Sequence, residues 1–285
     1  MKVLVTGVGG QLGHDVVREL EQRGHEVTGV GREEMDITDA EKVRKIIRDC
    51  VPDAVIHCSA YTAVDRAEDE ADQCRKVNVE GTKNIAEICA ELDCKMIYIS
   101  TDFVFSGEGE RPWETDDAAG PISVYGRTKY EGEDEVKSRL DKFFIVRISW
   151  VFGKNGNNFV KTMLRIGKEN GAVKVVDDQI GSPTYTRDMA VLLADMVQTE
   201  KYGVYHASNE GFCSWYDFAK EIFRLAGMDD VSVTPITSDQ FPAKAKRPFN
   251  SRMSKEKLVK EGFNKLPSWQ DALKRYLQEL GVSGS

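Results

Sequence analysis

The feature that most constrains the fold is a run of glycines near the amino terminus. Gly7, Gly10 and Gly13 follow directly after the apolar residues Val3, Leu4 and Val5. A strand that enters such a turn and continues as a helix brings free backbone N–H groups and the positive end of a helix dipole together, and the missing Cβ atoms let a phosphate approach. The pattern therefore predicts a site for the pyrophosphate of a dinucleotide.

The first half of the chain alternates between strand-like and helix-like segments. The expected strands are 2–6, 26–30, 54–58, 95–100 and 143–148, and the expected helices are 11–24, 39–50, 72–92 and 125–139. This alternation is typical of an α/β fold with a doubly wound parallel sheet, Rossmann-like in its order. We predict a dinucleotide-binding domain over residues 1–152 and a smaller C-terminal α/β substrate lobe over 153–285, with the chain crossing back to the first domain. Helices are also expected at 214–226 and 269–280, and a polar loop over the site at 107–121.

Composition argues against several classes of protein. A net charge of −8 over 285 residues does not provide the basic face that nucleic acid requires, and no apolar stretch approaches the length of a membrane span. The six cysteines contain no Cys-x-x-Cys pair and the four histidines are scattered, which favours reduced thiols and no metal site. We expect a cytoplasmic protein, as a monomer or homodimer, with no nucleic-acid or membrane partner.

The end of the second strand addresses the adenosine half of a dinucleotide. The strand ends at Val30-Gly31-Arg32, without an acidic residue to accept hydrogen bonds from a ribose 2′-hydroxyl, and Arg32 can instead face a 2′-phosphate. This favours NADPH, with NADH still possible, unless Arg32 is simply solvated. Asp36 and Ile37 lie where an adenine edge can be held. After the third strand, the run Ser59-Ala60-Tyr61-Thr62 either follows the cofactor or only starts a helix.

The chemistry is indicated by Tyr125 and Lys129, which are four residues apart and so share one face of a helix. A free phenol has a pKa of about 10, and a neighbouring ammonium together with the positive nicotinamide of the cofactor would lower it toward the working range of an acid–base group. Thr101 ends an expected buried strand, where its hydroxyl can donate to a ketone oxygen, although such a residue is more often only a helix cap. Together these groups predict hydride transfer involving a nicotinamide, with the phenol moving the proton.

These motifs, in this order, resemble the extended short-chain dehydrogenase/reductases, and local runs resemble the dTDP-4-dehydrorhamnose reductase family within them. The similar runs extend to about residue 280 and are 60–65, 100–105, 125–129, 149–152, 156–159, 181–184 and 247–251. The resemblance implies NAD(P)H-dependent reduction of the 4-keto group of dTDP-4-dehydro-6-deoxy-L-mannose to dTDP-L-rhamnose, in the biosynthesis of nucleotide sugars and cell-surface polysaccharides.

The resemblance also assigns roles. It implies catalytic Thr101, Tyr125 and Lys129, with a phenol that gives the proton and a lysine that orients cofactor and phenol. It implies a dTDP-sugar site at Val64, Asp65, Thr101, Asp102, Phe103, Trp150, Arg247 and Asn250, with Trp150 as a flat platform for the sugar and Arg247 near the diphosphate. It implies cofactor contacts at Gly7, Gly10, Gln11, Leu12, Gly13, Arg32, Asp36, Ile37, Ala60, Tyr61, Thr62, Ile99, Tyr125 and Lys129.

Two other functions stay open at this point. The regulatory beta subunit of methionine adenosyltransferase resembles the same family, so a non-catalytic nucleotide-binding subunit is one alternative. A sugar-nucleotide epimerase of the same fold, which would retain its cofactor through turnover, is the other. Dehydratases of the wider family carry a glutamate two residues after the threonine, and Phe103 occupies that place here. This weakens a dehydratase interpretation.

Overall fold

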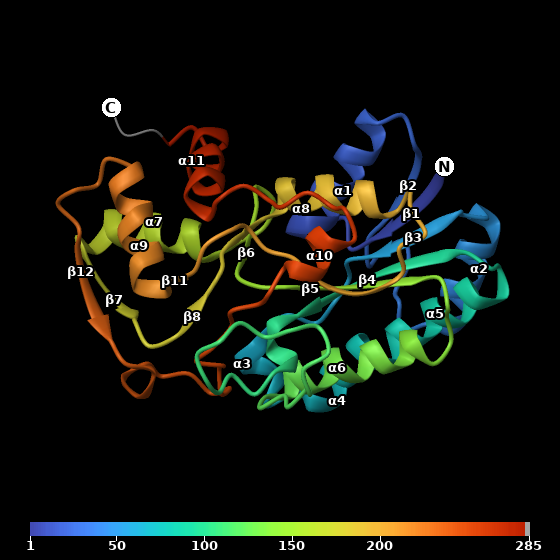
Figure 1. Ribbon diagram of the computed structural model, residues 1–285, viewed down its shortest axis with the longest axis horizontal. Helices are drawn as coiled ribbons and strands as arrows, with labels where there is room; N and C mark the ends of the chain where they lie inside the picture. Colours follow the sequence, from blue (N-terminus) through green and yellow to red (C-terminus); the bar gives the residue numbers. More distant parts are fainter. Residues whose placement is uncertain (283–285) are drawn as a thin grey trace.

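The computed structural model describes residues 1–282. Its main feature is a sheet of six parallel strands in the order β10-β5-β4-β3-β1-β2 (Figure 1). The strands are β1 (Lys2–Thr6), β2 (Glu26–Val30), β3 (Ala54–His57), β4 (Lys95–Thr101), β5 (Phe143–Ile148) and β10 (Gly203–His206). The order runs outward in one direction from β1 to β2 and in the other from β3 to β5, so it reverses between β1 and β3. This is a doubly wound sheet. The predicted α/β, Rossmann-like fold class is confirmed.

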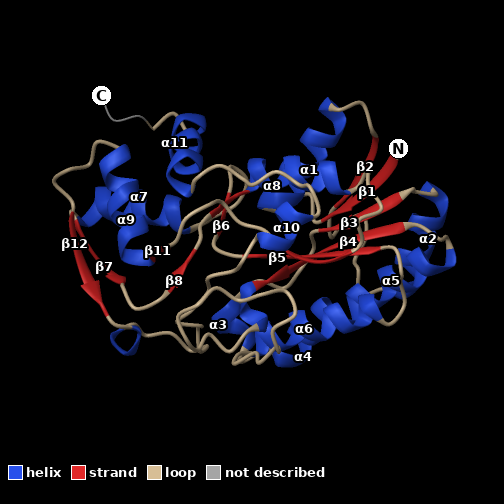
Figure 2. Cartoon of the chain, viewed as in Figure 1, coloured by secondary structure: helices blue, strands red, loops and turns tan. Residues whose placement is uncertain are grey.

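Helices cover both faces of the sheet, with α1 and α8 on one side and α5 and α6 on the other (Figure 2). The helices of the two layers are α1 (Gln11–Gln22) and α8 (Thr186–Met196), then α2 (Ala40–Cys50), α5 (Thr82–Glu91) and α6 (Val124–Lys137). Successive residues of a strand point to opposite faces, so Val3 and Val5 pack in one core and Leu4 in the other. Burial on both faces explains why the strands are continuously apolar.

The long helix expected over residues 72–92 is interrupted in the structure. It consists of α4 (Ala71–Arg75), a π-helical turn (Lys76–Gly81) and α5. The wider turn carries Asn78, whose side chain accepts a hydrogen bond from the backbone N of Tyr61 at 2.7 Å. Apolar periodicity continues through such a turn, so the sequence pattern alone does not reveal it.

A second group of elements forms around its own aromatic core, which includes Phe152, Phe218, Trp269 and Tyr276. Its helices are α7 (Phe159–Asn170), α9 (Trp215–Leu225) and α11 (Trp269–Glu279), so the expected helices near 214–226 and 269–280 are confirmed. Its strands pair two by two, as β6 (Val151–Phe152) with β9 (Thr184–Tyr185), β8 (Ile180–Gly181) with β11 (Cys213–Ser214), and β7 (Ala172–Val176) with β12 (Ser232–Ile236).

The chain passes between the two groups more than once. α8 and β10 lie in the sequence between β9 and β11 but pack with the six-stranded sheet, as does α10 (Glu256–Lys260) through Leu258. The short helices are α3 (Val64–Ala67) and the 3₁₀ turns Asp102–Val104 and Ser238–Gln240. A division into two domains at residues 152 and 153 stays a prediction. No helix within residues 1–282 is long and apolar enough to cross a bilayer.

Candidate active site

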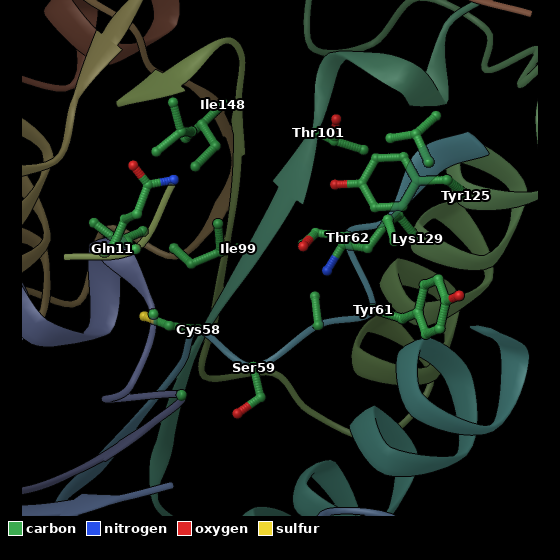
Figure 3. Close-up of a pocket in the computed structure, with 18 of the residues that line it drawn as sticks. Gln11, Cys58, Ser59, Tyr61, Thr62, Ile99, Thr101, Tyr125, Lys129 and Ile148 are labelled. Atoms are coloured by element: carbon green, nitrogen blue, oxygen red, sulfur yellow. The ribbon is translucent and has the colours of Figure 1, made fainter. Parts of the chain in front are cut away.

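A cavity of about 1220 Å³ lies above the carboxyl ends of the parallel strands, where the sheet order reverses. It extends from the glycine turn after β1 to aromatic side chains of the second group of elements. Ligands of open α/β sheets bind in this crevice. Figure 3 shows its middle, where Thr101, Tyr125 and Lys129 lie on one side and Gln11 and Ile148 on the other.

Most of the residues predicted for the site line this one cavity. Every predicted cofactor contact lines it, as do six of the predicted sugar contacts. These six are Val64, Thr101, Asp102, Phe103, Trp150 and Arg247. Asp65 and Asn250 do not line the cavity. The segment 107–121 is largely irregular, as expected, but none of its residues lines the cavity, because it packs against residues 248–254 instead.

The glycines of the turn have different structural reasons. Gly7 has a φ of +71°, and a Cβ there would lie 2.8 Å from the backbone N of Ser59. A Cβ on Gly13 would lie only 2.4 Å from the carbonyl oxygen of Gly7, so this glycine lets α1 pack against the end of β1. A Cβ on Gly9 would meet nothing within 4 Å. Of these three glycines, only Gly9 borders open space. A Cβ at Gly9 would therefore contact a bound ligand and no protein atom.

The first turn of α1 also fits a phosphate. Its N-cap residue, Gly10, has no side chain to accept from the free N–H groups, and no acidic residue lies in the first turn. The partial positive charge of the helix terminus is therefore not neutralised by the protein. This arrangement, together with the open space at Gly9, fits the pyrophosphate of a dinucleotide.

At the adenosine end, Arg32 has a largely exposed side chain, and its Nε lies 4.0 Å from the nearest carboxylate oxygen, that of Asp36. Asp36 in turn accepts hydrogen bonds from the backbone N and hydroxyl of Thr38, at 3.0 and 2.8 Å, which lower its pKa. The guanidinium is thus only weakly paired. An acidic side chain that the strand-end argument missed, Glu34, accepts from the backbone N of Gly31 at 2.9 Å.

The loop after β3 is fixed by buried polar side chains. Asn78 accepts from the backbone N of Tyr61 and donates to its carbonyl oxygen at 3.2 Å, and it also donates to Thr128 on α6 at 3.1 Å. The backbone N of Ser59 donates to Thr6 at 3.1 Å. The loop that lines the cofactor side of the cavity is therefore tied both to β1 and to the helix that carries Tyr125.

Thr101, Tyr125 and Lys129 come from the end of β4 and the first turns of α6. Ser123 caps α6 by accepting from the backbone N of Gly126 at 3.1 Å, so the helix starts just before Tyr125. The Thr101 hydroxyl donates to Oδ1 of Asp102 at 3.0 Å. Lys129 Nζ lies 4.1 Å from the centre of the Tyr98 ring, which places the ammonium on an aromatic face.

Burial dominates the electrostatics of this group. It raises the pKa of Tyr125, an effect that Asp102 increases and a hydrogen bond with Thr101 opposes. Burial lowers the pKa of Lys129 to about 7, against the attraction of Glu133. The expected lowering of the phenol pKa is wrong for the protein alone, because removal from water is the largest influence on this pKa and raises it. Tyr125 keeps its proton near neutral pH, which suits a proton donor.

A buried ion pair supports the site from behind. Glu133, two helical turns after Tyr125, accepts from Nε and Nη2 of Arg147 at 2.8 and 2.7 Å and from the Ser100 hydroxyl at 2.7 Å. Both charged side chains are almost fully buried. A bidentate pair of this kind fixes geometry more than it adds stability. It locks α6 to the ends of β4 and β5, and so holds Tyr125 relative to Thr101.

The charged residues predicted for the substrate pair with one another. Asp65 accepts from both guanidinium nitrogens of Arg247, at 3.0 and 2.8 Å, and from the backbone N of Lys244 and Ala245, each at 3.0 Å. These contacts lower the pKa of Asp65 to about 2. Asn250 is buried and donates to the carbonyl oxygen of Arg111 at 2.8 Å. The substrate roles of Asp65 and Asn250 stay predictions.

Gln11 joins the glycine turn to the second group of elements. Its Oε1 accepts from the backbone N of Gly153 and from Nδ2 of Asn158, both at 2.9 Å. Asn155 donates to the carbonyl oxygen of Gly9 at 2.9 Å. The loop before α7 is therefore fastened directly to the turn that would hold a pyrophosphate.

Sequence reasoning missed several lining residues. They include Cys58, Ser149, Phe152, Asn157, Asn158, Phe159, Trp215 and Phe218. Ser149 directly follows the end of β5, which is a signal that the sequence offers. Trp215 and Phe218 lie on an amphipathic helix in a distant part of the chain, and nothing in the local pattern separates them from ordinary core residues.

Within the described residues, no group of three or more His, Cys, Asp or Glu side chains is placed to hold a metal ion. All six cysteines are free thiols. The buried carboxylate of Asp15 receives a hydrogen bond from the hydroxyl of Thr186 at 2.5 Å.

Comparisons with known proteins show which family the chain resembles. A family model described as the RmlD substrate binding domain matches residues 1–282. The dTDP-4-dehydrorhamnose reductase of Aggregatibacter actinomycetemcomitans is 41% identical, over 96% of this chain and 97% of that protein.

Solved structures extend the likeness to the whole fold. A dTDP-4-dehydrorhamnose reductase from Clostridium acetobutylicum gives a TM-score of 0.96 at 42% identity, over 99% of this chain and 100% of the other. The enzyme of the same name from Bacillus anthracis, solved in complex with NADP, gives 0.93 at 41% identity, over 98% and 99% of the two chains. The family expected from the motifs is confirmed, and the chain belongs to the dTDP-4-dehydrorhamnose reductase family of oxidoreductases.

Proposed function

We propose that this protein reduces the 4-keto group of dTDP-4-dehydro-6-deoxy-L-mannose to the hydroxyl of dTDP-L-rhamnose, with NADPH as the reductant. The observation that carries the proposal is the meeting of Thr101, Tyr125 and Lys129 in one cavity with an uncapped glycine turn. The sugar nucleotide itself is taken from the family to which the chain belongs.

The residues present fit a nicotinamide dinucleotide. Gly9, Gly10 and the free N–H groups of α1 would hold its pyrophosphate, and the Asn78-anchored loop at Tyr61 would run beside it. When bound, the dinucleotide would supply the hydride for the carbonyl carbon. Arg32, with no close partner, would accept a 2′-phosphate, which supports NADPH over NADH.

The protein's own residues supply and place the proton. Tyr125, whose pKa burial raises, holds a proton at neutral pH and donates it to the carbonyl oxygen. The Thr101 hydroxyl turns from Asp102 to the same oxygen and holds it beside the phenol. Lys129, with a pKa of about 7, is partly protonated at neutral pH. Its ammonium form stabilises the negative charge that develops on the phenol. The Glu133–Arg147 pair keeps the helix of Tyr125 in place.

An assay of NADPH oxidation with a panel of nucleotide 4-keto sugars tests the proposal. The panel contains the dTDP sugar above, the same sugar on uridine and guanosine diphosphates, and a 4-epimeric dTDP sugar. We expect one NADPH consumed per sugar, the highest kcat/KM for the first compound, and dTDP-L-rhamnose as the product. A second series with NADH, and with Arg32→Ala, tests the contact with the 2′-phosphate.

The outcomes separate this function from its alternatives. Interconversion of sugars without net loss of NADPH would identify an epimerase, and binding of nucleotides without turnover would identify a regulatory subunit. Arg32→Ala is expected to reduce the preference for NADPH about tenfold, the usual size of one exposed charge-assisted contact. We place the reaction in the cytoplasm, which six free thiols support.

A further inference from the structure

Trp150 adopts a backbone conformation that bulky residues avoid. Its φ is +49°, and Val51 and Asp93 are the only other non-glycine residues with positive φ in the described chain. The backbone is held on both sides, because the Trp150 carbonyl accepts from the N of Thr184 at 3.0 Å and the Ser149 hydroxyl donates to the Ser182 carbonyl at 2.8 Å. Such strain persists only where the surroundings enforce it, and it is concentrated at functional sites.

One face of the Trp150 indole is covered by Trp215. The two ring centres are 3.7 Å apart and the planes differ by 12°, so the rings overlap almost fully. Trp215 is the first residue of α9, where the capping box of Ser214 and Asp217 fixes the start of the helix. Phe159 packs against the Trp215 ring with centres 4.6 Å apart. Trp215 therefore has a fixed position of its own.

The other face is covered by the backbone of Gly181. A Cβ built on Gly181 would lie 2.7 Å from Cε2 of Trp150, 2.9 Å from Cζ2 and 3.0 Å from Nε1. A Cβ beside the rim of the ring would lie closer to Cζ2 and Nε1 than to Cε2, the atom bonded to both. Because Cε2 is the nearest of the three, the Cβ position lies above the face of the ring. Trp215 already fills the opposite side, so the indole is sandwiched between the two.

A sandwiched indole offers its rim to the cavity that it lines. The rim of an aromatic ring carries partial positive charge, and in indole it includes the Nε1–H donor. Within residues 1–282, Trp150 Nε1 donates no hydrogen bond. It is also absent from the set of fully buried polar atoms without a partner, so this N–H is accessible. The expected flat platform for the sugar is therefore not what this geometry provides.

We propose that Trp215 is a positioning residue for sugar recognition. Together with Gly181 it holds Trp150 edge-on, so that the indole rim and its N–H meet a hydroxyl oxygen of the sugar. A rim with one donor selects the direction of a hydroxyl, whereas a free face would accept the apolar side of many rings. This inference depends on the proposed function, because it assumes a sugar nucleotide in the cavity.

The test compares Trp215→Ala, Trp215→Phe and Gly181→Ala with the unchanged protein and with Trp269→Phe. Trp269 is a matched control, because it is buried in the same group of elements but does not line the cavity. For each protein we measure the KM for the sugar nucleotide, kcat and the Kd for NADPH. We also record the circular dichroism couplet that two stacked indoles produce.

We expect Trp215→Ala to abolish the couplet and raise the KM for the sugar at least about tenfold, as misplaced contact groups do, with an unchanged Kd for NADPH. Trp215→Phe should also abolish the couplet but restore most of the KM, because a phenyl ring can still cover the indole. Gly181→Ala should raise the KM as well, since the added methyl displaces the ring. Trp269→Phe should retain the couplet and the KM.

An unchanged sugar KM in Trp215→Ala, with the couplet lost, would overturn the positioning role while leaving the reductase function intact. A raised KM that Trp215→Phe fails to restore would also contradict it. A wild-type protein that reduces no nucleotide sugar but still shows the couplet would instead remove the proposed function, and with it this inference.

Discussion

The two ends of the cavity are built by different means. At the glycine turn, positions are set largely by close backbone packing, as between Gly13 and Gly7 and between Gly7 and Ser59. At the substrate end, they are set by side-chain pairs between distant segments. Asp65 and Arg247 are 182 residues apart. Trp150, which precedes β6, stacks on Trp215 at the start of α9. Close backbone approach around a contiguous glycine motif thus characterises the cofactor end, whereas the pairing of side chains from distant segments characterises the substrate end.

The largest effect is expected at the glycine turn. Gly13→Ala places a Cβ 2.4 Å from a backbone oxygen that cannot move aside, so we expect a loss of stability of about 1–3 kcal/mol and weaker NADPH binding. Gly9→Ala is the matched control, because its Cβ meets no protein atom and should leave stability unchanged. Thermal unfolding and NADPH titration of both variants separate packing from phosphate access. Equal melting temperatures would contradict the packing role of Gly13.

The next prediction concerns Asp102, which lines the cavity and whose carboxyl is buried. Burial raises the pKa of its carboxyl to about 6, and its Oδ2 has no hydrogen-bond partner. Because this folded-state pKa exceeds the unfolded value, the contribution of the group to stability is full in acid and is lost as the pH rises through about 6. That loss amounts to at most about 3 kcal/mol.

Asp102→Asn cannot ionise, so it should avoid this loss. Urea unfolding of both proteins at about pH 5 and about pH 8 measures the effect, with urea chosen because it leaves the charges unscreened. The variant should gain stability relative to the wild type on going to the higher pH. If the free energies of unfolding of the variant and the wild type differ by the same amount at both pH values, burial does not destabilise the ionised Asp102 carboxylate.

A smaller effect is expected where a side-chain pair holds the substrate end. Asp65→Asn weakens the pairing with Arg247 and the bonds to the 244–245 backbone, so the segment loosens. We expect the KM for the sugar nucleotide to rise about tenfold, equivalent to about 1.4 kcal/mol, with an unchanged Kd for NADPH. Lys244→Ala, which removes only the exposed pair with Asp69, is the control. A shift in the Kd for NADPH would show that the two ends are not separable.

The same comparison explains what the sequence could predict. The glycine turn, the helix of Tyr125 and Lys129 and the parallel strands were predictable because each depends on residues adjacent in the chain. The π-helical turn at Asn78 was not, because its side chain bonds to Tyr61 in another loop, a contact that the local sequence does not reveal. Nor could the pairing of Arg247 with Asp65 be read from either segment, since each alone is an ordinary charged surface residue.

The electrostatics were predictable only in part. The sequence placed a cation beside a phenol, but the sign of the pKa change depends on how deeply both groups are buried. Burial raises the pKa of Tyr125 and lowers that of Lys129 to about 7. The spacing of four residues carries no information on that depth, which is set by the loop after β3 and by the Glu133–Arg147 pair behind the helix.

The central claim is that the protonated phenol of Tyr125 gives the proton to the reduced ketone. The most direct measurement is the single-turnover rate of NADPH oxidation by Tyr125→Phe with saturating dTDP-4-dehydro-6-deoxy-L-mannose, beside its Kd for NADPH. We predict a rate at least ~100-fold below that of the wild type, the usual scale for loss of an acid–base group, with the Kd unchanged. A rate equal to that of the wild type would contradict the account.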